Sequence, residues 1–282
     1  MSGRTTEATR RDLRVGSGSV RVFEAGPHQA SEAVAFFHGN PGSAGDWVDL
    51  VEDVGGLARA IAFDLPGFGQ SPSPPGFGHT LEEYADWVGQ ALDAAGISRV
   101  HLVLHDFGGP IALVWAAGNP ERVASVTLFN TGILTGYDWH TMARVWQTPV
   151  LGELSMMLSS RQVFRRAVSS AEPRGLPGDF LDEMFDNYDR ETRSAVLDLY
   201  RSAKNLGDRA DEVARQLAAA DIPALVVWGA KDHYLNASFA SRQREAFPSA
   251  EIHLVPDSGH WPFIDSPDVC RALLVAFLEQ RS

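Results

Sequence analysis

The chain contains a single cysteine, Cys270, among 282 residues. One cysteine cannot form a disulfide within the chain, so the fold must be stable without one. Cys270 stands in an apolar helical pattern, which predicts a buried structural thiol. The sequence also lacks an apolar run of the roughly 18 residues that a membrane-spanning helix needs, and its first residues are too polar for a signal peptide. We therefore expect a cytoplasmic protein that does not bind membranes.

Basic residues are scarce as well. The chain has 24 Lys and Arg against 36 Asp and Glu, which gives a formal net charge of −12. This charge argues against nucleic acid or an anionic membrane as the natural partner. The histidines show no spacing typical of metal ligands, so neither a metal nor an organic cofactor is expected. The sequence leaves a small-molecule substrate as the partner, with a monomer and a homodimer both open.

Short apolar runs typical of buried strands are plentiful instead. They alternate with helical patterns, as in an α/β protein whose mostly parallel central sheet carries helices on both faces. The runs cover residues 33–37, 60–63, 99–104, 124–129, 223–228 and 251–255, and they follow a hairpin at 12–24. Between residues 131 and 211 only helical patterns occur. We therefore predict a core domain of residues 1–130 and 212–282 and a helical cap domain of residues 131–211.

Three polar side chains follow predicted strands. Asp106 lies in Leu-His-Asp-Phe-Gly-Gly, at the apex of a sharp turn from a strand to a helix. Asp232 ends the stretch Trp-Gly-Ala-Lys-Asp, and His260 lies in Ser-Gly-His-Trp-Pro. The carboxyl ends of parallel strands meet at one edge of a sheet, where ligands bind in open α/β folds. The three side chains are thus predicted to meet below the cap.

These residue types indicate a covalent mechanism. A carboxylate nucleophile needs no activation, so Asp106 can displace a leaving group from an sp³ carbon and form an alkyl ester. His260, oriented by Asp232, can then activate the water that hydrolyses this ester. The resulting oxyanion on Asp106 needs two N–H donors, which we expect from the backbones of Asn40 and Phe107.

The same motifs resemble the Asp-nucleophile branch of the α/β-hydrolase superfamily, which includes epoxide hydrolases and haloalkane dehalogenases. The α/β-hydrolase elbow usually reads G-x-S-x-G, and here Asp replaces the Ser. The resemblance runs from about residue 14 to 278 and implies the α/β-hydrolase fold with a helical cap (lid). Its motifs are His-Gly-Asn-Pro at 38–41, Asp-Leu-Pro-Gly-Phe-Gly at 64–69, His-Asp-Phe-Gly-Gly-Pro at 105–110, Gly-Ala-Lys-Asp at 229–232 and Gly-His-Trp-Pro at 259–262.

The resemblance leaves the leaving group open. Epoxide hydrolases donate hydrogen bonds to the epoxide oxygen from lid tyrosines, one of them often in a Tyr-Arg dipeptide. Tyr200, which precedes an Arg, fits this pattern. For the second donor the lid offers Tyr137 and Tyr188, plus His140 and Trp146, and the sequence does not choose among them. Haloalkane dehalogenases bind the halide with an Asn that Asn40 matches and with a Trp after the nucleophile. Phe107 stands in place of that Trp, and this favours an epoxide.

Further residues are candidates for contact with the leaving group or the substrate, namely Trp139, Trp146 and His105. Asn130 occupies the position where many dehalogenases carry their acid, but an amide cannot be an anion, so Asp232 is preferred. Aromatic and methionine side chains near these positions predict an apolar pocket. We therefore predict an epoxide hydrolase that converts an apolar or aromatic epoxide to a vicinal diol. A haloalkane dehalogenase is one alternative, and a non-hydrolytic lyase or binding protein on the same fold is another.

Overall fold

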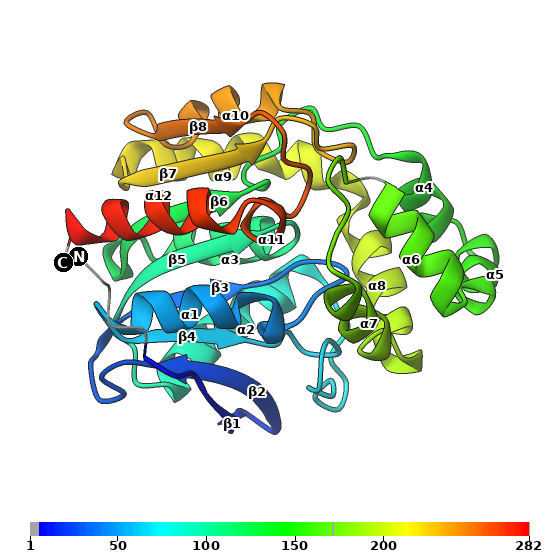
Figure 1. The fold of residues 1–282 in the computed structure, drawn as a ribbon, viewed down its shortest axis with the longest axis horizontal. Coiled ribbons are helices and arrows are strands. Elements are labelled where there is room, and N and C mark those ends of the chain that lie inside the picture. Colours follow the sequence, from blue (N-terminus) through cyan, green and yellow to red (C-terminus); the bar gives the residue numbers. More distant parts are fainter. Residues whose placement is uncertain (1–5, 171, 282) are drawn as a thin grey trace.

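The computed structural model describes residues 6–170 and 172–281. Within them, an eight-stranded sheet runs through the centre in the order β1-β2-β4-β3-β5-β6-β7-β8 (Figure 1). The strands β4, β3, β5, β6, β7 and β8 are parallel to one another, whereas β2 pairs antiparallel with β1 and with β4. This mostly parallel sheet agrees with the α/β class predicted from the alternating patterns.

The strands coincide with the apolar runs of the sequence. The strands from β3 to β7 are buried on both faces, apart from the first residues of β3 and β5 and one residue in β6, because helices cover both sides of the sheet. Edge strand β8 is largely exposed. The strands are β1 (Thr9–Val15), β2 (Gly18–Ala25), β3 (Glu32–Phe37), β4 (Ala60–Phe63), β5 (Arg99–His105), β6 (Val123–Phe129), β7 (Ala224–Gly229) and β8 (Glu251–Val255).

Helices α1 and α12 lie on one face of the sheet, and α2, α3 and α9 lie on the other (Figure 1). The α-helices are α1 (Val48–Gly55), α2 (Leu81–Ala94), α3 (Gly108–Gly118), α4 (Thr141–Gln147), α5 (Leu151–Leu158), α6 (Arg161–Ser170), α7 (Gly178–Asp186), α8 (Arg190–Ser202), α9 (Leu206–Ala220), α10 (Ser238–Arg242), α11 (Pro262–Asp265) and α12 (Pro267–Glu279). Short 3₁₀ helices cover Ala44–Trp47, Pro120–Arg122, Ala203–Asn205 and Gln243–Glu245. The single cysteine, Cys270 on α12, is buried.

The segment between β6 and β7 is helical in its described part. Helices α4 to α8 gather at the end of the molecule where the parallel strands have their carboxyl ends (Figure 1). The expected end of this insert, residue 211, falls inside α9, which packs against α3 on the core. No Gly or Pro follows residue 207 until Pro223, so the helix continues past the expected boundary.

Candidate active site

The turn between β5 and α3 holds Asp106 in a left-handed backbone conformation, with φ +46°. Such a conformation costs a non-glycine residue about 1–3 kcal/mol and persists only where surrounding packing imposes it. Here the packing is tight on both sides. A Cβ at Gly108 would overlap the carbonyl of Phe37 at the end of β3, and a Cβ at Gly109 would overlap Thr131 after β6. The two glycines therefore let the turn sit between the neighbouring strands and point Asp106 away from the sheet.

Gly39 is expected to be equally intolerant of a side chain. A Cβ there would overlap the Asp106 side chain, so Gly39→Ala should lower the free energy of unfolding by about 1–3 kcal/mol through overpacking. Gly118→Ala is the matched control, because Gly118 is exposed on α3 and has no atom in the way of a Cβ. It should leave the free energy of unfolding unchanged or raise it by up to about 1 kcal/mol. Equal urea-unfolding midpoints for the two variants would contradict the packing described here.

The turn after β3 delivers a backbone donor to Asp106. The Asn40 N–H donates to Asp106 Oδ1 at 2.7 Å. The turn itself is fixed by His38, whose Nε2 accepts from the Leu65 N–H at 2.9 Å, after β4. Burial lowers the pKa of His38 to about 4, so the ring is neutral and can accept. Within the described residues the Phe107 N–H has no hydrogen-bond acceptor. This N–H lies at the start of α3, where the helix dipole favours negative charge.

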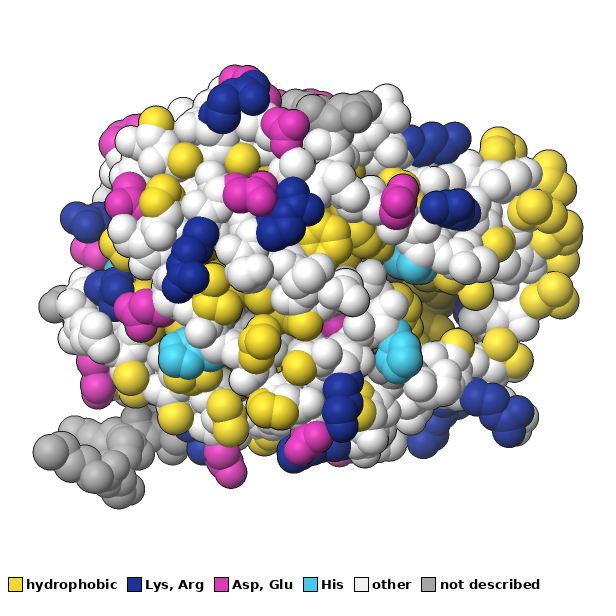
Figure 2. All heavy atoms as spheres, turned by 90° about the horizontal axis from the view of Figure 1, so that it is seen from above, with side chains coloured by type: hydrophobic (Ala, Val, Ile, Leu, Met, Phe, Trp, Pro, Cys, Tyr) yellow, Lys and Arg dark blue, Asp and Glu magenta, His cyan; other side chains and the backbone are white. Residues whose placement is uncertain are grey.

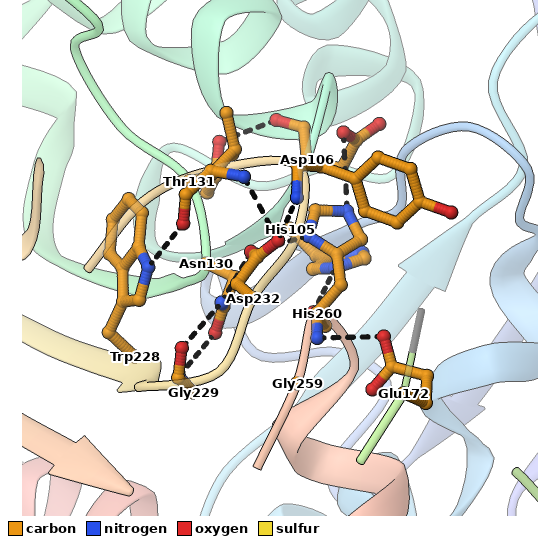
Figure 3. Close-up of polar contacts among 12 residues, drawn as sticks. His105, Asp106, Asn130, Thr131, Glu172, Trp228, Gly229, Asp232, Gly259 and His260 are labelled. Atoms are coloured by element: carbon orange, nitrogen blue, oxygen red, sulfur yellow. Dashed lines mark hydrogen bonds and ion pairs between the residues drawn. The ribbon is translucent and has the colours of Figure 1, made fainter. Parts of the chain in front are cut away.

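The three predicted catalytic side chains lie together at this edge of the sheet (Figure 3). His260 Nδ1 is 2.7 Å from Asp232 Oδ2, and His260 Nε2 is 3.4 Å from Asp106 Oδ2. Asp232 and His260 are buried, whereas the Asp106 side chain keeps 15% of its surface exposed. The imidazole of His260 thus lies between two carboxylates. Asp232 is buried, and Asp106 is partly exposed.

Asp232 is held by more than the histidine. Its Oδ1 accepts the backbone N–H groups of Tyr234 and Leu235 at 2.7 and 2.9 Å. Its Oδ2 also accepts Nδ2 of Asn130 at 2.6 Å, and Asn130 Oδ1 in turn accepts the Gly229 N–H at 2.8 Å (Figure 3). The sequence excluded Asn130 as an anion but did not predict this positioning contact, which joins the ends of β6 and β7.

The two carboxylates set the charge of His260. Burial alone lowers the pKa of an imidazole, but Asp232 and Asp106 outweigh it and raise the pKa of His260 to about 10. Burial likewise works against ionisation of Asp106, yet the contacts with His260 and the Asn40 N–H lower its pKa to about 2. At neutral pH the site therefore holds an anionic Asp106 beside a cationic His260, and neutralising Asp106 would lower the pKa of the histidine.

The backbone of His260 is fixed from two sides. Its carbonyl accepts Nε2 of His105 at 2.9 Å, and its N–H donates to Oε1 of Glu172 at 2.9 Å (Figure 3). Glu172 lies between α6 and α7, and its Oε2 is buried without a hydrogen-bond partner. Burial raises the pKa of Glu172 to about 7 despite the hydrogen bond from His260. This carboxyl group joins the helical insert to the loop that carries His260. No sequence pattern indicated this role.

Glu172 should make the stability of the protein pH-dependent. Its pKa is about 7 in the folded chain against an ordinary 4.5, so the folded state holds the proton more tightly across that window. Raising the pH from about 4.5 to 7 should therefore lower the stability of the wild type relative to Glu172→Gln, which has no proton to lose, by on the order of 2 kcal/mol. Urea unfolding at several pH values measures the difference, and the exposed Glu121→Gln serves as control. A pH-independent difference would contradict this account.

A cavity of about 440 Å³ opens above Asp106 and His260, between the sheet and the helical insert. Tyr200, Trp146, Trp139, Tyr137, Asn40 and Phe107 all line it. The Tyr200 hydroxyl accepts from Nδ2 of Asn40 at 3.4 Å, and its ring packs on Phe107. The structure thus brings these predicted substrate-contacting residues to one cavity, and burial raises the pKa of Tyr200, so its hydroxyl stays protonated.

Three of the predicted residues have other hydrogen-bond partners. His105 does not line the cavity, because its buried ring lies beneath His260 and donates to the His260 carbonyl. The expectation that His105 contacts substrate is therefore wrong. The indole N–H of Trp139 donates to the Lys204 carbonyl at 3.2 Å, and the Tyr137 hydroxyl donates to the Tyr234 carbonyl at 3.4 Å. Trp139 and Tyr137 thus contribute ring surface to the cavity, while their donors are engaged elsewhere.

The cavity reaches the surface through the insert. Leu158 and Val163, on α5 and α6, line the cavity and are also exposed to solvent. Val150 and Met157 of the insert are exposed as well. Figure 2 shows hydrophobic side chains gathered on the surface at the right-hand end of the molecule. Among the residues with described positions, no cluster of His, Cys, Asp or Glu could hold a metal ion. In the same part of the chain, no helix is both long and apolar enough to cross a bilayer.

Comparison with known proteins identifies the family. Residues 32–267 match the family described as alpha/beta hydrolase fold. The chain therefore belongs to the α/β-hydrolase fold family.

Several relatives share about a quarter of their residues with the chain. A 2-hydroxy-6-oxononadienedioate/2-hydroxy-6-oxononatrienedioate hydrolase from Pseudomonas sp. is 27% identical over 276 residues, which are 93% of this chain and 92% of that protein. A cis-3-alkyl-4-alkyloxetan-2-one decarboxylase from Shewanella oneidensis is 27% identical over 259 residues, 84% of this chain and 79% of that protein. The acetyltransferase component of an acetoin cleaving system from Cupriavidus necator is 27% identical, and the chain spans only 66% of its length.

Solved structures with a similar fold include haloalkane dehalogenases. DatA from Agrobacterium tumefaciens C58 superimposes with a TM-score of 0.85 at 24% identity, and the match covers 100% of both chains. DbeA from Bradyrhizobium elkani USDA94 gives a TM-score of 0.84 at 24% identity and covers 96% of this chain and 98% of that chain. At this level of identity the similarity establishes a shared fold.

Proposed function

We propose that the protein hydrolyses apolar epoxides to vicinal diols through an alkyl ester on Asp106. The observation that carries the proposal is the ionised Asp106 at the strained turn, facing the cavity, with His260 on its other oxygen and the Asn40 N–H on the first. A serine at this place would serve acyl transfer, whereas a carboxylate displaces a leaving group from carbon without prior deprotonation.

In the first step, Asp106 Oδ attacks a ring carbon of the epoxide. The carbon–oxygen bond breaks, its electron pair stays on the oxygen, and that oxygen takes the proton of the Tyr200 hydroxyl. Asn40 Nδ2 already donates to the Tyr200 oxygen, so the hydroxyl proton is free to point towards the substrate. Alkoxides are poor leaving groups, and a positioned acid of this kind contributes about 10²–10⁴-fold.

In the second step, water hydrolyses the ester. Esterification removes the negative charge of Asp106, so the pKa of His260 falls and its proton passes to the Tyr200 phenolate left by the first step. The neutral ring, oriented by Asp232, then takes a proton from the attacking water. The tetrahedral oxyanion on Asp106 is stabilised by the Asn40 and Phe107 N–H groups. The departing alkoxide then takes this proton from His260, and the proton of the regenerated Asp106 carboxyl passes to His260, which restores the anionic Asp106 beside a cationic His260.

The substrate class follows from the cavity. Its outer part, between α5 and α6, is lined by apolar side chains such as Met156, Phe164 and Val168. A cavity of about 440 Å³ holds a molecule larger than a two- or three-carbon epoxide. We therefore expect an epoxide with an extended apolar or aromatic substituent. The Shewanella oneidensis decarboxylase, named for an alkylated oxetanone, also acts on a strained oxygen ring with apolar substituents.

A haloalkane dehalogenase is the second candidate, and Trp146 favours it. Within the described residues its indole N–H has no hydrogen-bond acceptor, and its ring lines the cavity beside Tyr200. Together with Asn40 Nδ2, this N–H could hold a halide in place of the Trp that Phe107 replaces. Bromide release from a panel of bromoalkanes distinguishes this candidate from the first.

A single turnover in ¹⁸O-labelled water tests the proposal. With excess enzyme and an apolar epoxide such as a long-chain 1,2-epoxyalkane, the label should enter the Asp106 carboxyl and not the diol, because the attacking water delivers its oxygen to the ester carbonyl. Peptide mass spectrometry locates the label. Label found only in the diol would mean direct attack of water on the epoxide and would sink the ester mechanism. Label in Asp106 only with bromoalkanes would establish the dehalogenase instead.

A further inference from the structure

His140 caps the amino terminus of α4 with its imidazole. Its backbone is extended, with φ −62° and ψ 160°, and its Nδ1 accepts the Ala143 N–H at 3.2 Å. A neutral imidazole has one acceptor nitrogen and one N–H donor. Because Nδ1 accepts, the proton must be on Nε2. The helix cap therefore fixes the tautomer of this ring.

The ring is neutral at physiological pH. Burial lowers the pKa of His140 below its ordinary value and outweighs the opposing effect of Asp106, while the charge of His260 adds to the lowering. A neutral ring offers Nε2–H as a donor whose state does not change across the physiological range.

The same ring faces the reaction site. His140 lines the cavity that Asp106 and His260 line from below. It packs edge-on against Tyr234 at a centroid distance of 5.3 Å, and Tyr234 packs on His260 at 5.1 Å. On another side it meets the Tyr200 ring at 6.4 Å. Within the described part of the chain no acceptor receives the Nε2–H, so this donor is left for a molecule in the cavity.

We propose that His140 is a further catalytic residue, whose Nε2–H holds the leaving oxygen of the epoxide together with the Tyr200 hydroxyl. The inference rests on the proposed function and completes it, since the sequence left the second donor to the epoxide oxygen open. Of the two lid tyrosines considered for this place, Tyr137 donates to the Tyr234 carbonyl and Tyr188 donates to Sδ of Met156.

The chemistry needs only a hydrogen bond from His140. As Asp106 forms its bond to carbon, the breaking carbon–oxygen bond places its electron pair on the ring oxygen. Tyr200 transfers its proton to that oxygen, and His140 Nε2–H stabilises the growing charge without giving up its proton. The imidazole is therefore unchanged after each turnover. Removing one such preorganised donor typically slows the step by about 10²-fold.

His140→Asn separates the donor from the helix cap. Asn is among the best N-capping residues, so its oxygen can replace Nδ1 as acceptor for the Ala143 N–H, while its Nδ2 takes the place of the ring's Cδ2 and falls short of the position of Nε2–H. With an apolar epoxide that the wild type turns over, rapid quenching and intact-protein mass give the rates of ester formation and ester hydrolysis separately. We expect His140→Asn to slow ester formation about 10²-fold, to leave ester hydrolysis unchanged and to keep the thermal midpoint of the wild type.

Two further variants and the wild type separate the loss of the donor from the loss of the helix cap and from a failure of the proposed function. His140→Ala should slow ester formation equally and also lower the thermal midpoint, because it removes the cap. Adding Tyr200→Phe to His140→Asn should reduce ester formation below either single variant. Ester formation at the wild-type rate in His140→Asn overturns the proposal, and so does an equal slowing of both steps. If the wild type forms no ester with any epoxide, the proposed function itself has failed, and the wild-type measurement alone reveals it.

Discussion

Asp106→Ala should abolish both turnover and the covalent intermediate. Among the described residues that line the cavity, Asp106 is the only Asp or Glu, so no neighbouring carboxylate can take over the attack. We expect the turnover of epoxides to fall by at least about 10⁴-fold, with no increase in protein mass after incubation with substrate. Product analysis and intact-protein mass spectrometry measure the two effects.

The same variant has a consequence that does not depend on activity. Asp106 is one of the two carboxylates that raise the pKa of His260 to about 10, so its removal should lower that pKa measurably in an NMR titration. Asp86→Ala, at an exposed position on α2, is the control and should alter neither turnover nor the titration. Residual turnover above about a hundredth of the wild-type rate would show that another group initiates the reaction.

His260→Gln should arrest the reaction after its first half. Asp106 remains an ionised nucleophile in this variant, but no base is left to activate the hydrolytic water. The ester should therefore form in a burst of one equivalent and then decay about 10²–10⁴-fold more slowly than in the wild type. Intact-protein mass should show the enzyme plus one substrate molecule.

Comparison with Asp106→Ala gives this prediction its control, because that variant should show no added mass under the same conditions. Rapid steady turnover by His260→Gln would show that the histidine is not the base. Failure to form any ester would instead point to a role of the positive charge of His260 in binding or alkylation.

The sequence predicted the sheet well, because its central strands are buried on both faces and appear as continuous apolar runs. The same logic placed Asp106, Asp232 and His260 at one edge, since each follows such a run. The end of the insert was predicted less well. Helix α9 packs on the core, yet its amphipathic pattern continues that of α8 with no break at residue 211.

Contacts between distant segments could not be predicted in the same way. The hydrogen bond that the His260 N–H donates to Glu172 joins the insert to the loop after β8, and no local pattern marks it. His105 was predicted to contact the substrate, but consecutive residues around a strand end point to opposite sides, and its buried ring lies beneath the site. The role proposed for His140 depends on which ring nitrogen caps a helix, which only coordinates can show.

The order of strands in the sheet also bears on how the protein acquires activity. Asn40, Asp106, Asp232 and His260 follow β3, β5, β7 and β8, and several of these strands pair with partners that are not their neighbours in the sequence. No short stretch of the chain contains the site, because its residues are spread from Asn40 to His260, and non-local pairing of this kind forms slowly. Recovery of activity during refolding should therefore follow the final docking of β7 and β8, later than the return of helical secondary structure. Measurable activity therefore indicates that the sheet has assembled completely.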